Sequence, residues 1–79
     1  MFHQKLTDEE WNQLASQTIK SELTKRGMKY HDLARHLKLM GVDETQASIA
    51  SKMSRGTFSF TFVLQVMTVL GIERLDLRN

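Results

Sequence analysis

Four stretches of the chain carry apolar residues at helical spacing, and each stretch ends at a glycine. The chain contains no proline, so nothing in these stretches obliges a helix to break. The pattern predicts an all-α protein with helices over 8–26, 30–40, 44–55 and 60–70. The glycines that end them are Gly27, Gly41, Gly56 and Gly71.

Capping residues precede two of the four predicted helices. Thr7 and Glu10 have the spacing of a capping box at the start of the first helix, and Asp43 and Gln46 repeat that spacing before the third. The second helix follows residues without a side-chain acceptor, although Asp32 can face the amides of its first turn. We therefore expect the first and third helices to have the best-defined starts.

The end of the chain has a different period. Over 72–77 two leucines alternate with charged residues, which predicts a short β-strand. The helix over 60–70 is apolar nearly all round and is therefore expected to be buried on several sides. The predicted fold is a single domain spanning 1–79, with four helices and a short C-terminal strand.

Size and composition limit the class of protein. The chain has 79 residues, which is one domain at most, and it contains no cysteine, which excludes disulfides and thiolate metal sites. A hydrophobic fraction of 41% with 25% charged residues is typical of a folded domain. No run approaches the roughly 20 apolar residues that span a bilayer, and no basic start precedes an apolar segment. We expect a cytoplasmic protein.

The charges are distributed unevenly along the chain. Residues 1–24 carry two basic and four acidic side chains, whereas residues 25–56 carry seven basic and three acidic ones, a net charge of +4. Residues 57–79 are balanced. A basic excess confined to one contiguous segment is typical of a surface that binds phosphates, so the charge pattern favours a nucleic-acid partner.

The basic segment also carries an ordered set of motifs, namely Asp32-Leu33-Ala34-Arg35-His36-Leu37, Gly41-Val42, Ile49, Arg55-Gly56 and Leu70-Gly71. Over residues 20–72 this order resembles the Cro and repressor-like (XRE-type) helix-turn-helix family, and it is nearest to a small bacterial group with runs like 55–60. The resemblance implies a lambda-repressor-like fold and a dimer that binds duplex DNA to regulate transcription. In that family the turn glycine directly follows the leucine matched by Leu37, whereas here 38–40 intervene.

The third predicted helix is the candidate recognition helix. Placing Ile49, Ala50 and Met53 on its buried side leaves a polar and basic face opposite, and Gln46 is assigned a capping role. Short hydroxyl side chains let a helix approach base edges, and lysine or arginine can bind guanine. The predicted base-reading residues are Thr45, Ser48, Ser51, Lys52 and Arg55. The predicted phosphate contacts come from the second helix and are Lys29, Tyr30, Arg35 and Lys38.

A homodimer is expected because three short helices cover only part of the apolar fourth helix. The C-terminal strand would then pair with its own copy about a two-fold axis, or with 2–5 of the same chain in a monomer. The three phenylalanines at 58, 60 and 62, like Trp11, are expected in the core or in this interface. The predicted interface residues are Phe60, Val63, Met67, Leu75 and Leu77.

No catalytic constellation is found, so we do not expect an enzyme, a metal or a cofactor. His31 and His36 would lie about 140° apart on a helix and could not share a metal ion from one face. The main alternative is a protein-interaction module, an antitoxin or adaptor, that uses the same fold to bind a partner chain. RNA binding is a third reading, for which only Tyr30 offers an aromatic ring beside the basic residues.

Overall fold

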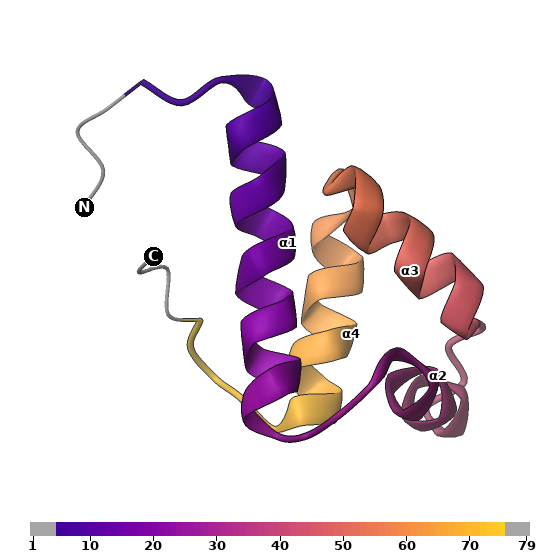
Figure 1. Cartoon of the computed structure of the whole chain (residues 1–79). Helices are drawn as coiled ribbons and strands as arrows, with labels where there is room; N and C mark the ends of the chain where they lie inside the picture. The colour runs from indigo at the N-terminus through magenta and orange to yellow at the C-terminus, as the bar shows by residue number, and fades with distance from the viewer. Residues whose placement is uncertain (1–4, 76–79) are drawn as a thin grey trace.

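The computed structural model describes residues 5–75, which form four α-helices (Figure 1). They are α1 (Asp8–Lys25), α2 (Tyr30–Leu39), α3 (Gln46–Arg55) and α4 (Phe60–Leu70). α1 and α4 lie side by side, and α2, seen nearly end-on in Figure 1, crosses them steeply. α3 packs against α1 and α2, while α2 also contacts α4. The all-α prediction is confirmed, and no described helix is long and apolar enough to cross a membrane.

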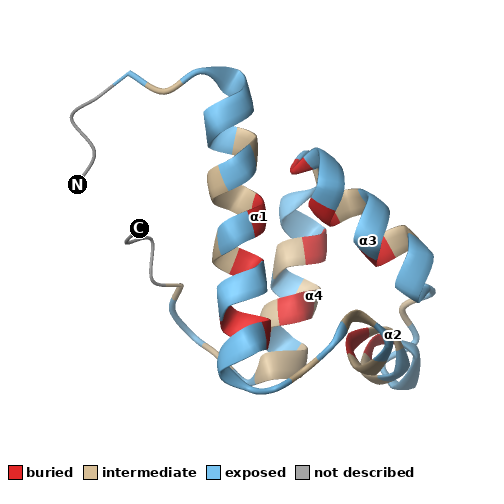
Figure 2. Ribbon diagram, viewed as in Figure 1, coloured by how far each residue is buried: buried red, intermediate tan, exposed pale blue. Residues whose placement is uncertain are grey.

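The core is built from one pair of apolar residues on each helix. The two members of every pair are four positions apart, which puts them on the same helical face. All eight side chains are buried and together form one cluster, and Figure 2 shows buried residues on each of the four helices. They are Ile19 and Leu23, Leu33 and Leu37, Ile49 and Met53, and Phe62 and Val66. A single inward stripe on each helix therefore sets the arrangement of the four.

The first helix begins where its capping box predicts. The amide of Glu10 donates to Thr7 Oγ1 over 3.1 Å, and the amide of Thr7 donates to Glu10 Oε1 over 2.9 Å. Three acidic residues occupy the first turn, at the positive end of the helix dipole. The helix ends at Lys25, one residue before the predicted end.

The third helix begins two residues later than predicted, and the capping role assigned to Gln46 is wrong. Thr45 is the N-cap, because its Oγ1 accepts the amide of Ser48 over 3.0 Å and its own amide donates to Ser48 Oγ over 2.9 Å. Asp43 belongs to the preceding turn, which starts once α2 ends at Leu39, one residue before the predicted end. A capping box formed by the hydroxyl groups of Thr45 and Ser48 thus replaces the predicted one between Asp43 and Gln46.

The predicted C-terminal strand is not formed in the described residues. The amide of Ile72 donates to the Met67 carbonyl over 3.1 Å, which closes the end of α4. Residues 72–75 then run back beside α1, and no residue within 5–75 pairs with them as a strand (Figure 1). The rest of the predicted strand, Asp76 and Leu77, lies outside residues 5–75.

The fourth helix is less buried than its composition predicts. Only Phe62 and Val66 are buried, whereas Phe60 is 69% exposed and Leu64 is 48% exposed. α4 meets α1 and α2 on one side only, so its opposite face stays uncovered. Trp11 on α1 is also about half exposed. Phe60, Leu64 and Trp11 therefore lie outside the core and expose apolar surface.

Candidate functional site

The outer face of α3 is exposed and carries mostly small side chains. Ile49 and Met53 turn inward, and between Gln46 at the start and Arg55 at the end, the solvent face consists of alanine and serine. With so little side-chain bulk, another molecule can approach the helix backbone closely. The exposed set is Gln46, Ala47, Ala50, Ser51, Ser54 and Arg55.

Two of the predicted base-reading residues lie at the edge of this face rather than on it. Ser48 Oγ donates to Glu44 Oε1 over 2.6 Å. Lys52 pairs with Glu44 Oε2 at 3.1 Å and lies over the Phe62 ring, 5.5 Å from its centroid. The Lys52 side chain is only 26% exposed. Glu44, in the turn before α3, therefore holds both side chains.

The other predicted base-reading residues are exposed. Thr45 caps α3, and Arg55 Nη1 donates to Ser51 Oγ over 2.6 Å, one turn back on the same helix. Ala50, which the sequence places on the buried side, faces solvent. The exposed face is therefore rotated by roughly 90° from the predicted one.

Ion pairing separates the basic residues into two groups. Lys25 and Arg26 pair with Glu22, Arg35 pairs with Asp32, and Lys52 pairs with Glu44. The other lysines and arginines in 5–75 form no ion pair with an acidic side chain, so their charges are not neutralised within the described part of the chain. The unpaired ones are Lys5, Lys20, Lys29, Lys38, Arg55 and Arg74.

The four predicted phosphate contacts divide in the same way. Lys29, Lys38 and Arg35 are all exposed. The two lysines have no acidic partner in 5–75, whereas Arg35 Nη2 lies 3.5 Å from Asp32 Oδ1. Tyr30 is half-buried against the core, and burial raises the pKa of its hydroxyl. Asp32 accepts the amide of Lys29 over 3.0 Å, and this hydrogen bond is the main cause of the lowered pKa of its carboxyl.

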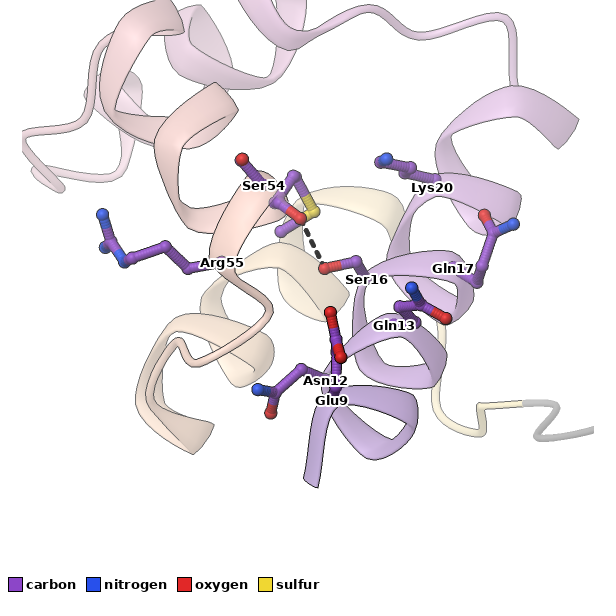
Figure 3. A pocket seen from close by; sticks show the side chains of 9 residues that line it. Glu9, Asn12, Gln13, Ser16, Gln17, Lys20, Ser54 and Arg55 are labelled. Carbon is purple, nitrogen blue, oxygen red and sulfur yellow. Dashed lines mark hydrogen bonds between the residues drawn. The ribbon is translucent and has the colours of Figure 1, made fainter. Parts of the chain in front are cut away.

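A polar cleft of about 410 Å³ lies along the junction between α1 and the C-terminal end of α3 (Figure 3). At its floor, the buried Ser16 donates through Oγ to the Met53 carbonyl over 2.6 Å. In Figure 3, Ser54 and Arg55 form the α3 side of the cleft, and Arg55 extends away from α1. Its α1 side, which we did not predict as functional, consists of Glu9, Asn12, Gln13, Ser16, Gln17 and Lys20.

An apolar hollow of about 270 Å³ lies on the other flank of α1, toward the start of α4. Three of the predicted dimer residues, Phe60, Val63 and Leu75, line it. Met67 is half-buried and is not among the lining residues, and Leu77 lies beyond the described part of the chain. The remaining lining residues are Trp11, Leu14, Ala15, Thr18, Ile19 and Phe58.

Metal-ligating side chains do not cluster in 5–75, where no group of three histidines or carboxylates could hold an ion. His31 lies beside Asp32, with 3.4 Å between Nε2 and Oδ1.

Residues 11–75 match the family described as Domain of unknown function (DUF6471), and the chain belongs to that family. The matched segment includes most of α1, the other three helices, the polar cleft except Glu9, and the apolar hollow. The chain has no match among curated proteins or among solved structures.

Proposed function

We propose that this protein binds duplex DNA with α2 and α3 acting as a helix-turn-helix, and that it regulates transcription as a homodimer. The observation that carries this proposal is the outer face of α3, which is exposed, narrow and free of bulky apolar groups. A helix of this kind fits the major groove, which is about 12 Å wide. Its predominantly small side chains favour close approach to base edges.

The base-reading residues proposed from the structure differ in part from those predicted by the sequence. Gln46 lies at the start of α3, where recognition helices contact bases, and a glutamine amide can bind adenine through two hydrogen bonds. Ser51 and Arg55 remain in the set. The alanines at 47 and 50 can contact thymine methyl groups. Ser48 and Lys52 leave the set because Glu44 already holds them.

The first test is sequence discrimination. A preferred duplex is selected from a randomised pool, and its dissociation constant is compared with that of a scrambled duplex as salt is varied. Gln46→Ala should reduce the preference roughly 5- to 150-fold, the equivalent of one bidentate base contact. Ala50→Glu should abolish binding to both duplexes, whereas Thr68→Glu adds the same charge on α4 and should be milder. The absence of salt-dependent binding to any duplex by the wild-type chain would refute the proposal.

The dimer is proposed to form across the apolar hollow. Thr18 is the one polar residue among the described residues that line it, so the hollow favours an occupant that brings apolar side chains. A second copy would bring its own Trp11, Phe60 and Val63 to the same site, as a two-fold interface requires. A dimer would also present two copies of α3 to a palindromic duplex.

Sedimentation equilibrium tests this dimer. Leu75→Asp or Phe60→Asp should dissociate it, because each puts a charge into an apolar interface. Leu39→Asp is the matched control, since Leu39 is 78% exposed on α2 and does not line the hollow. A wild-type chain that is monomeric at tens of micromolar would contradict the dimer.

The second candidate function is a protein-interaction module, and the exposed Phe60 and Leu64 on α4 favour it. Such a module needs no anion-binding surface. The duplex titration separates the two functions, because only a DNA-binding protein should show a steep dependence of affinity on salt.

A further inference from the structure

Lys20 occupies a central position on the polar flank of α1. It lines the polar cleft between α1 and α3, and it also lines a second cleft of about 330 Å³ between α1 and the start of α2. Lys29 and Tyr30 lie on the far side of this second cleft. No carboxylate in the described part of the chain pairs with Lys20 or Lys29. Lys20 thus connects the two clefts with a charge that is not neutralised.

The polar cleft continues the exposed face of α3. Ser54 belongs both to that face and to the wall of the cleft, so a molecule lying on α3 also reaches α1. There it meets Gln13, Gln17 and Lys20, which recur at helical spacing and are all exposed. Amide and ammonium groups at this spacing provide a row of hydrogen-bond donors.

We propose that this row on α1 binds the sugar-phosphate backbone of the duplex that α3 reads, with Lys20 as the central ionic contact and Gln13 and Gln17 as neutral donors. The inference rests on the proposed DNA binding and adds a third helix to the interface. Lysine and glutamine side chains are common phosphate ligands, and such contacts position the protein without reading sequence. The strand runs from Ser54 past Lys20 toward Lys29.

The acidic first turn of α1 limits the site. Glu9 lines the end of the polar cleft away from Lys20, next to Asp8 and Glu10. Three carboxylates repel a phosphate chain, so the backbone passes the Lys20 end of the cleft and avoids the Glu9 end. This polarity fixes the direction in which the strand leaves α3.

The test compares Lys20→Ala with Lys25→Ala. Both remove one positive charge from α1, but Lys25 pairs with Glu22 and lies about 140° away around the helix. Lys20→Ala should weaken preferred and scrambled duplexes alike, by roughly fivefold at 0.15 M salt, and should lower the slope of log K against log salt by about 0.9. Lys20→Arg should restore the slope, and Lys25→Ala should leave it unchanged.

The neutral donors give a second, independent readout. Replacing Gln13 and Gln17 together by alanine should weaken both duplexes while leaving the salt slope unchanged, because amides displace no counterions. Circular dichroism verifies that each variant is folded, as the exposure of the three side chains predicts. If Gln46→Ala alters discrimination while Lys20→Ala keeps the wild-type slope and affinity, the role of α1 is refuted and DNA binding stands. If no duplex binds to the wild-type chain, both proposals fall.

Discussion

Two hollows flank the core-facing strip of α1, and their linings differ in chemistry. Toward α3 the lining is formed by amides, hydroxyls and charged groups, and toward α4 it is formed by aromatic and aliphatic side chains. Ile19 and Leu23 lie on the strip between them and are buried in the core. One helix therefore presents a polar and an apolar surface in addition to its buried face.

The difference indicates what each hollow can accept. Polar groups lose hydrogen bonds with water when a surface is covered, so the polar cleft favours a partner that supplies charge and acceptors, such as phosphate. An apolar surface gains when covered by another apolar surface, about 25 cal/mol for each Å² removed from water. The chemistry of the linings thus supports separate roles for the two flanks of α1.

The largest effect is expected where α3 ends against α1. Gly56 has a φ of 69°, and a β-carbon there would fall on the backbone carbonyl of Asn12. Gly56→Ala should therefore destabilise the fold by about 3 kcal/mol. The free-energy cost of a left-handed backbone at alanine is added to that of the steric clash with Asn12. Chemical denaturation followed by circular dichroism measures the loss.

Gly71 is the matched control for Gly56. It ends α4 with a φ of 68°, but no heavy atom lies within 4 Å of the position of its β-carbon. Gly71→Ala should cost about 1 kcal/mol from the backbone alone. Equal losses in the two variants would show that close approach of α1 to α3 at Asn12 contributes nothing.

A smaller effect is expected from the floor of the polar cleft. Ser16→Ala removes the hydroxyl that donates to the Met53 carbonyl, one of the carbonyls without a partner inside α3. The variant should lose about 1 kcal/mol, since the gain in helix propensity offsets part of the lost hydrogen bond. Ser21→Ala makes the same change at an exposed position of α1 and should not destabilise the protein. A Ser16→Ala variant as stable as Ser21→Ala would contradict a structural role for this contact.

The smallest effect is expected from Glu22, which forms ion pairs with Lys25 and Arg26 at the C-terminal end of α1. Its hydrogen bond with Arg26 is the main cause of a carboxyl pKa below the ordinary value of 4.5, with Lys25 acting in the same direction. Because the folded pKa is lower than the unfolded one, this stabilisation is present above about pH 4.5 and is lost as the pH falls through the folded pKa. Glu22→Gln should flatten the decline in stability in that range, as measured by denaturation at several pH values. An unchanged pH profile would show that the pair with Arg26 adds no stability.

Much of the helical architecture could be predicted from the sequence because its signals are local. These signals act within a few residues along the chain. They are the capping box of Thr7 and Glu10, the glycines that end α3 and α4, and the paired core positions such as Ile49 and Met53. The start of α3 was predicted two residues early because Asp43 and Thr45 are both good N-caps, and only the turn geometry selects Thr45.

The sequence alone determined the four helices and the basic excess of the middle segment, since these depend on spacing and composition. The tertiary structure decided which charges remain available. Glu44 neutralises Lys52, and Lys20, counted with the acidic N-terminal segment, comes to lie near Lys29 across a cleft. It also decided that 72–75 lies beside α1 without forming a strand. The reason is physical: charge pairing and strand pairing depend on groups distant in sequence, and packing alone brings such groups together.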